Sequence, residues 1–397
     1  MDEIVEYIIE FLLYGNKEAA KQVGYNVHPT ECYQYKVCIQ PNGHLGKDWV
    51  LPDLTGEAGL PAVAVCQRSG LPGEAGPIII TTDIIYNTAF FLSKAEELIH
   101  PQRDKHGRLC AKHSILGQTH RLINPIIDEY SRVLMQALGL ELPKPGFAAV
   151  NLTHDIDILD YYRHLRGAIG GISRGHLKEV IASWRDIHND PAYTFDWLME
   201  QDRQVVKRLP QTQVIYFVKH TTGKGYDYPQ YNLQGKDFQQ LSSYLTQQGA
   251  ILGLHSSYYP TPLPPYSSTP HRSHFLRCDI ERLQQLVAAG VTDDYSMGFA
   301  DHIGFSMGTC RSFRWIDPVH YRLTNLTIHP LAIMDNTLSD EQYMNLSPEK
   351  AWEMCQQTIQ QVHQYHGELN LLWHNTTVNQ PYHSLLYSQI INYLCNL

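Results

Sequence analysis

The chain has 397 residues, of which 43% are hydrophobic and 18% charged, the composition of an ordinary globular protein with a sizeable core. Its net charge of −9 and its lack of any lysine- or arginine-rich run argue against a nucleic-acid-binding protein. A chain of this length is expected to form two domains, or one barrel with an appended module.

The sequence carries no signal for secretion or membrane insertion. Its start, MDEIVEYIIEFLLYGN, alternates acidic with apolar residues and lacks the basic region and cleavage site of a signal peptide. No stretch approaches the roughly 20 apolar residues of a membrane span. The eight cysteines are scattered without a Cys-x-x-Cys pair, which favours reduced thiols over disulfides or a zinc ribbon. We therefore expect a soluble, cytoplasmic protein.

Residues 1–145 are predicted to form a smaller α/β domain, to which the sequence assigns no function. A helix is predicted over residues 3–14 and a strand over YQYKVCIQP, residues 33–41. A segment punctuated by glycine and proline follows, and then a buried strand at Ile78–Thr82 and a helix over residues 87–99.

The end of this first domain carries a third helix and a linker. The helix is predicted over residues 124–139, with Asn124 as its N-cap and Pro125 at the first helical position. The linker is LELPKPGF, near residues 140–147. The remaining polar groups, Asp83 and the turn DKHGR at residues 104–108, are expected to lie on the surface.

From residue 146 to residue 397, short apolar strands alternate with helical stretches, which is typical of parallel strands in a barrel or a doubly wound sheet. The helices include residues 273–290 and 347–367. The irregular segment SSYYPTPLPPYSSTPHRS, residues 256–273, is predicted to be an active-site loop or lid. The predicted strands are Ala148–Thr153, Gln213–Lys219, Ala250–Ser256, Val291–Asp294, Leu326–Met334 and Leu369–His374.

Several of these strands end in polar residues. The stretch VNLTHDIDIL places Asp155 and Asp157 at the end of one strand, where two carboxylates would repel each other unless a cation or a shared proton relieved them. Later strands end near His255, Asp335 and His374. Such groups at one rim of a sheet indicate a divalent metal site with proton-transfer residues beside it.

Each residue also has a plain structural alternative. A single histidine after a strand is most often a hydrogen-bonded structural residue, and an aspartate there is usually a helix or turn cap, as Asp157 and Asp335 could be. The joint occurrence across four strands favours the functional interpretation.

The motifs THDID, GLHSSYYP, GFSMGTCRSF and LLWHNTT, in this order, resemble those of the NodB-type polysaccharide deacetylases, carbohydrate esterase family four. The resemblance covers residues 146–397 and is strongest to a bacterial subgroup with HDxD, GLHxSY and WHN motifs and an extra N-terminal domain. It implies a distorted (β/α) barrel. It also implies metal-dependent removal of an acetyl group from an N- or O-acetylated sugar or glycan precursor, as in surface-polysaccharide biosynthesis.

The resemblance implies roles for five residues. Asp155 matches the catalytic base and His374 the histidine that protonates the leaving group, while Asp335 matches an acid that supports catalytic groups. Asp157 and His255 match metal ligands. The chemistry agrees, because a metal lowers the pKa of its water and an adjacent carboxylate can take the proton.

The sequence departs from the family pattern at the second metal histidine. Four residues after His255 the family has histidine, whereas this chain has Tyr259, and a phenol is a poor substitute at neutral pH. His274 is the better candidate for the third ligand, with His271 as an alternative.

A second departure is Ser306, where the subgroup would be expected to show an arginine. Arg311 or Arg314 is then the candidate to orient the base carboxylate. Trp373, Tyr259 and Arg311 are predicted to contact substrate, although Trp373 could equally be a core aromatic.

One aspartate and two histidines with an open position suit Zn²⁺ best, and Co²⁺, Ni²⁺ or Fe²⁺ would fit the same ligands. The predicted substrate is a small molecule or an oligosaccharide. Two alternatives stay open: a catalytically impaired carbohydrate-binding or scaffolding protein, and a related hydrolase of C–N bonds in a non-sugar amide.

Overall fold

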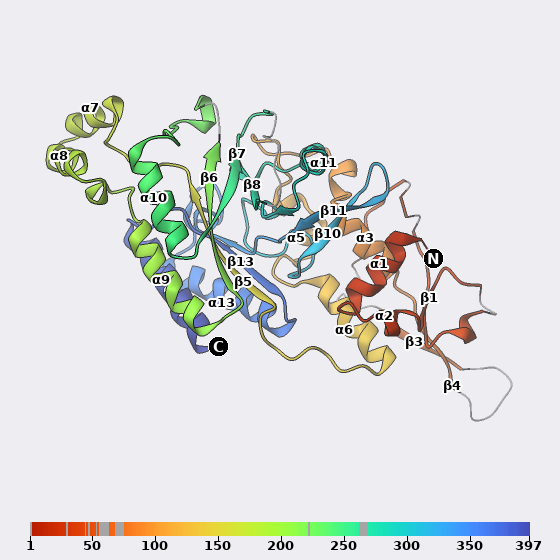
Figure 1. The fold of residues 1–397 in the computed structure, drawn as a ribbon. Helices are drawn as coiled ribbons and strands as arrows, with labels where there is room; N and C mark the ends of the chain where they lie inside the picture. The colour runs from red at the N-terminus through yellow and green to blue at the C-terminus, as the bar shows by residue number, and fades with distance from the viewer. Residues whose placement is uncertain are drawn as a thin grey trace.

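The computed structural model describes residues 2–28, 31–43, 45–46, 48–52, 54, 63–67, 75–220, 223–261 and 269–397. Parts of two sequence predictions lie outside these residues: most of the glycine- and proline-punctuated segment, and residues 262–268 of the predicted lid. Figure 1 shows two units side by side, one built from the first part of the chain and one from the rest.

The N-terminal unit contains a small sheet with the strand order β1-β2-β4-β3. Strands β1, β2 and β4 are parallel, and β3 runs antiparallel to β4. The strands are β1 (Val23–Tyr25), β2 (Val37–Ile39), β3 (Val63–Gln67) and β4 (Ala75–Ile80). The helices are α1 (Glu3–Leu12), α2 (Lys17–Ala20), α3 (Ile84–Leu92), α4 (Glu96–Ile99), α5 (Ile115–Gln118) and α6 (Ile126–Leu138).

The ends of these helices follow from local chemistry. Asp2 caps α1 by accepting a hydrogen bond from the backbone N–H of Ile4, and the buried positions of α1 recur at helical spacing. Gly139 ends α6 in the left-handed conformation, with a φ of 69°. Pro125 is the N-cap of α6 rather than its first helical residue, so the predicted start was one residue early.

The second unit is built on a nine-stranded sheet with the order β10-β11-β9-β8-β7-β6-β5-β13-β12. All neighbouring pairs are parallel except β10 and β11. The strands are β5 (Ala149–Ile156), β6 (Thr212–His220), β7 (Ile251–Ser256), β8 (His271–Ser273), β9 (Asp293–Asp294), β10 (Phe313–Asp317), β11 (Arg322–Ile328), β12 (Ile333–Met334) and β13 (Glu368–Leu372).

This sheet curls into an incomplete barrel whose edges are β10 and β12 (Figure 1). The predicted mixed α/β fold, a distorted (β/α) barrel preceded by a smaller α/β unit, is therefore confirmed. The barrel helices are α7 (Leu165–Ser173), α8 (Leu177–Arg185), α9 (Phe195–Arg208), α10 (Lys236–Gln247), α11 (Ile280–Ala288), α12 (Asp335–Ser339), α13 (Pro348–Gln364) and α14 (Pro381–Asn396).

Three element predictions were wrong in detail. The single strand predicted at Leu326–Met334 is two strands, β11 and β12, which lie far apart in the sheet order. The helix predicted from residue 273 begins only at Ile280, after strand β8 and a short 3-10 turn at His274–Leu276. The helix predicted over residues 87–99 is broken between α3 and α4.

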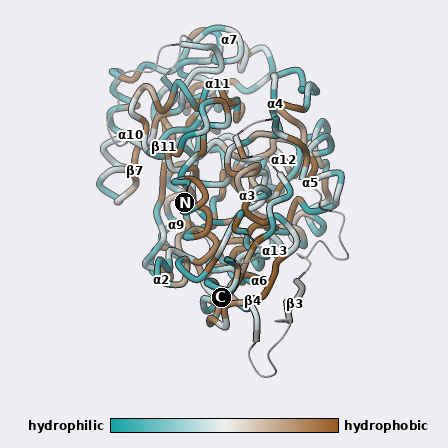
Figure 2. Tube along the Cα trace, turned by 90° about the vertical axis from the view of Figure 1, so that its right-hand side faces the viewer, coloured by the Kyte–Doolittle hydropathy of each residue, from teal (hydrophilic) through white to brown (hydrophobic). Residues whose placement is uncertain are grey.

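The two units share one hydrophobic core. Apolar side chains of α1, α3 and α6 pack in the same buried cluster as residues of β10 and β11, including Phe313, Trp315 and Leu326. The indole N–H of Trp315 donates to the carbonyl of Ser93 at 3.2 Å. Figure 2 shows apolar segments in the interior and hydrophilic ones at the periphery, for example around α2.

Within the described part of the chain, no helix combines the length and the apolarity needed to span a bilayer.

Candidate functional site

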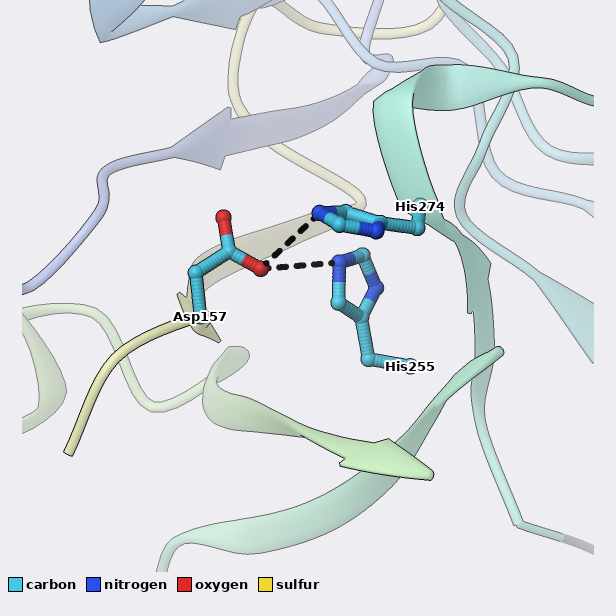
Figure 3. A group of neighbouring side chains, drawn as sticks. All are labelled: Asp157, His255 and His274. Atoms are coloured by element: carbon cyan, nitrogen blue, oxygen red, sulfur yellow. Dashed lines mark ion pairs between the residues drawn. The ribbon is translucent and has the colours of Figure 1, made fainter. Parts of the chain in front are cut away.

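Three strand ends of the barrel bring Asp157, His255 and His274 together (Figure 3). Asp157 follows β5, His255 lies on β7, and His274 follows β8. The Nε2 atoms of His255 and His274 lie 3.4 and 3.3 Å from the same oxygen, Oδ1 of Asp157. Since β5, β6, β7 and β8 are consecutive parallel neighbours, their carboxyl ends share one rim of the sheet.

The geometry of this trio fits a tetrahedral cation. Ligand atoms held about 2.0–2.1 Å from a tetrahedral ion are about 3.3 Å apart. Oδ1 of Asp157 and Nε2 of His255 are buried and have no hydrogen-bond partner among the described residues. Buried polar atoms are normally paired, so two that face each other without partners indicate a missing ligand.

Groups behind the trio fix both histidines. Nδ1 of His255 donates to the carbonyl of Arg272 at 3.2 Å, and Nδ1 of His274 lies 2.9 Å from Asp227 Oδ1. Each contact leaves Nε2 as the free nitrogen on the side of Asp157. Asp227 is itself held by the hydroxyl of Ser257 and the backbone N–H of Tyr258.

The electrostatics of the trio favour positive charge. Burial would raise the pKa of Asp157, but His274 and His255 hold it well below the usual range. Burial would lower the pKa of His274, yet Asp157 and Asp227 raise it to about 9. The same negative environment that would hold a proton on His274 would hold a cation in its place.

Asp155 lies beside the trio and is paired with Arg272 of β8. Nη1 of Arg272 lies 3.0 Å from Asp155 Oδ1 and 2.8 Å from the hydroxyl of Thr153. Its Nε donates to the carbonyl of Tyr295, and the guanidinium lies over the ring of Phe217. The other oxygen of Asp155, Oδ2, is 3.6 Å from His255 Nε2 and is left to act as a proton acceptor.

His374, just after β13, faces Asp155 and Asp157 across the site. Its Nε2 lies 4.0 Å from Asp155 Oδ2 and 3.7 Å from Asp157 Oδ2. Its Nδ1 lies 2.8 Å from Asp335 Oδ1, and its backbone N–H donates to the other oxygen of Asp335. Burial opposes protonation, but Asp335 and the other two carboxylates raise the pKa of His374 to about 10.

These groups line a cavity of about 240 Å³. Its walls include Asp155, Asp157, His274 and His374 together with apolar Met334 and Leu372. The cavity therefore brings carboxylates and imidazoles from several strand ends to one space, and groups of these types can hold a cation or transfer protons.

The structure does not bring Arg311 to this site. Its Nε lies 2.6 Å from Asp128 of α6, and its guanidinium covers the rings of Phe11 and Tyr14. It shares a pocket with Ala148, which precedes β5, whereas Asp155 lies near the other end of that strand. Arg311 therefore joins the two units, because its charge is neutralised by a buried carboxylate of the first one.

Trp373 differs from its predicted role, whereas substrate contact by Tyr259 stays a prediction. Trp373 is fully buried and packs on Tyr387, so it is a core aromatic. Tyr259 is 37% exposed at the rim, where its hydroxyl accepts a hydrogen bond from the N–H of Tyr226. His274 rather than Tyr259 completes the trio.

Two more histidines, His154 of the first motif and His271, the alternative third ligand, are structural. His154 is fully buried, with Nε2 3.0 Å from Asp202 and Nδ1 2.9 Å from the carbonyl of Trp373. His271 is fully buried between Asp294, at 2.7 Å, and the hydroxyl of Ser256, at 2.9 Å. Because side chains alternate between the two faces of a strand, His271 lies on the face of β8 opposite to Arg272 and points away from the trio.

Sequence reasoning missed Arg272, Asp227 and Lys219. Arg272 lay in a segment interpreted as a loop, so its inward position in a strand was not considered. Asp227 comes from a connection that carried no motif. The buried ammonium of Lys219 donates to the carbonyl of Asp157 at 2.7 Å, and burial lowers its pKa; its place at the end of a predicted strand was the available signal.

Comparison with known proteins adds three findings. The model of a family of unknown function, DUF7033, matches residues 5–143, a stretch that contains none of the residues of the trio or its neighbours described above. No curated protein matches the chain. A solved structure described as a "putative polysaccharide deacetylase" from Mycobacterium smegmatis is similar, with 12% sequence identity and a TM-score of 0.39, over 65% of this chain and 87% of that one.

Proposed function

We propose that this protein is a metal-dependent hydrolase that removes an acetyl group from an N- or O-acetylated sugar or glycan precursor. The observation that carries the proposal is the convergence of Asp157, His255 and His274 beside the paired groups Asp155 and His374. The motif resemblance of residues 146–397 to the NodB-type deacetylases supports the substrate class.

The trio would hold a divalent ion, with Zn²⁺ the best match to one carboxylate and two imidazoles; Co²⁺, Ni²⁺ and Fe²⁺ fit the same set. Such an ion, when bound, polarises a carbonyl and lowers the pKa of water. The unpartnered atoms of Asp157 and His255 are the structural support for this assignment.

Asp155 has the position of a general base. Arg272 engages its Oδ1 and thereby fixes the plane of the carboxylate, so that Oδ2 faces the cavity. A proton taken from water would be held on Oδ2, which leaves the carboxyl group neutral, while the hydrogen bond from Arg272 to Oδ1 keeps the group in place.

His374 has the position of a general acid on the opposite side of the cavity. Asp335 accepts the hydrogen bond of Nδ1, so Nε2 points toward the reacting centre and can deliver a proton to the leaving amine or alcohol. The hydroxyl of Thr377 donates to Asp335 at 2.5 Å and holds that carboxylate in place.

Tyr259 and Ser306, the two departures from the family pattern, leave an imidazole and a guanidinium to be supplied by other residues, and this geometry offers both. His274 supplies the imidazole that Tyr259 cannot supply. Arg272 supplies the guanidinium that Ser306 cannot supply. The presence of these two replacement side chains supports an active enzyme rather than a binding protein that retains only the cleft.

The test is elemental analysis of the purified protein combined with a screen for acetate release. We expect near-stoichiometric zinc or another transition metal, lost in His255→Ala and retained in His188→Ala, which alters a histidine whose side chain is 54% exposed. Acetate release from N-acetylated chito-oligosaccharides or O-acetylated glycan fragments should disappear in Asp155→Asn. A protein that binds no metal after incubation with Zn²⁺ would contradict the proposal.

A further inference from the structure

A turn from the N-terminal unit reaches the rim of the catalytic cavity. The sequence predicted the turn DKHGR, residues 104–108, to be a set of surface polar groups. Instead, His106 is only 5% exposed, and Arg108 lines the 240 Å³ cavity together with Asp155 and His274. This turn lies inside the stretch matched by the family of unknown function.

Arg108 ties three segments together. Its Nη1 donates to the carbonyl of Phe275 at 2.7 Å, and its Nη2 lies 3.1 Å from the hydroxyl of Tyr343. Its Nε donates to Asp104 at 2.8 Å within the turn. Because Asp104 neutralises the guanidinium, Arg108 is a poor receptor for an anionic substrate group and a good brace between loops.

The segment that Arg108 holds is the one that carries His274. After His274, Phe275 and Leu276 adopt φ angles of 58° and 54°, the left-handed region. Each such non-glycine residue costs about 1–2 kcal/mol, so two in succession need contacts from outside the turn. His106 supplies one, with its ring 4.9 Å from that of Phe275, and Arg108 supplies the hydrogen bond to the carbonyl.

The rest of the turn is anchored to the barrel as well. Nδ1 of His106 lies 3.2 Å from the hydroxyl of Tyr258, and Lys105 donates to Gln342 at 2.6 Å. A short way along the chain, the N–H of Ala111 donates to the carboxylate of Asp301. These contacts fix the position of the turn relative to the cavity.

We propose that the N-terminal unit completes the catalytic site in cis: Arg108 is a positioning residue that holds the turn at residues 274–276, and therefore the ligand His274, in its binding geometry. This inference rests on the proposed metal-dependent function, and it gives the N-terminal unit a role in that function. The unit thus acts on the metal site through the backbone beside one ligand.

The test is Co²⁺ binding to the full-length, metal-stripped protein, followed through its visible absorption. For Arg108→Met we expect at least a tenfold rise in the Kd for Co²⁺ and an altered absorption spectrum, because groups that support ligands are worth about 10–100-fold in metal affinity. Arg108→Lys keeps the charge but cannot reach all three partners, so its Kd should lie between those of wild type and Arg108→Met.

Two control variants separate this effect from general destabilisation. Arg163→Met removes an arginine that pairs with Asp237 at 2.9 and 3.2 Å, away from the cavity, and should lower the Tm without changing the Kd for Co²⁺. Lys112→Met alters an exposed residue of the N-terminal unit close to the turn and should also leave the Kd unchanged.

The outcomes distinguish this inference from the proposed function. If the wild type binds no metal, both are overturned. If the wild type binds Co²⁺ and Arg108→Met binds it equally well with the same spectrum, only the role of Arg108 is overturned. If Arg108→Met does not fold, Tyr343→Phe, which removes only the contact between Nη2 and the phenol hydroxyl, is decisive. A two- to threefold higher Kd supports the inference, and an unchanged Kd and spectrum refute it.

Discussion

Replacing Arg272 by methionine should be one of the most destabilising single changes in the barrel. Arg272 is fully buried and faces Asp155, which is 3% exposed, at 3.0 Å. Removing one partner of a buried ion pair costs about 3–5 kcal/mol, because the other charge stays buried without compensation. The methionine side chain should still pack on Phe217. The decrease in the free energy of unfolding should therefore reflect mainly the loss of the Arg272–Asp155 ion pair.

This magnitude is checked by equilibrium unfolding in guanidinium chloride with a chelator present, so that metal binding does not contribute. Adding Asp155→Asn removes the stranded charge, and the double variant should recover at least about 1.5 kcal/mol relative to the sum of the single changes. Arg314→Met, at an arginine whose Nε donates only to the carbonyl of Thr324, is the control and should cost less than about 1 kcal/mol. Additive effects of the two site variants, or a loss below 1 kcal/mol for Arg272→Met, would refute the reasoning.

Two further predictions concern other histidines. His329 lies between Glu368 and Asp293, at 2.6 and 3.0 Å. Burial opposes its charge, yet the two carboxylates raise its pKa to about 9. A raised folded-state pKa means that this stabilisation is complete below about pH 6.5 and is lost as the pH rises through about 9; it amounts to about 3 kcal/mol. Urea unfolding of wild type should therefore show a larger loss over this pH range than that of His329→Gln, in which only other histidines such as His274 and His374 contribute. Equal losses in the two proteins would contradict the assignment to His329. At the site, Asp335→Asn removes the anionic partner of His374 and should lower kcat on any verified substrate by about 100-fold or more while leaving the metal content unchanged, and a variant with wild-type kcat would remove Asp335 from the proton-transfer pathway.

Most of the barrel strands were predictable from the sequence, since five of the six predicted strands correspond to single strands of the sheet, although β10 was not predicted. The strand alternation on β5 also placed Asp155 on the opposite face from His154. What sequence reasoning could not supply was the short strand β8, whose three residues lie in a segment rich in proline and tyrosine. Arg272 was missed for that reason.

The error at Arg311 has a similar origin. An arginine in the third motif was expected to reach the base, because motif residues are assumed to face one site. Its actual partner, Asp128, lies 183 positions earlier in a helix of the other unit. A contact between residues so far apart in the sequence depends on how the two units pack against each other, and no local sequence pattern predicts it.

Charge balance at the site gives an independent reason for a cation there. Four carboxylates take part in the network of direct contacts, those of Asp155, Asp157, Asp227 and Asp335. Two basic side chains contact the same network, Arg272 and Lys219. Of the two negative charges that remain, protonated His374, whose pKa is raised to about 10, offsets one. The last one would be offset by a proton on His274 or by a bound cation, since a buried uncompensated charge is costly. A cation in that place would leave the Nε2 atoms of His255 and His274 free to act as ligands. It would also explain how two carboxylates stand so close in the chain: Arg272 compensates Asp155 at the end of β5, and the ion would compensate Asp157, which follows that strand.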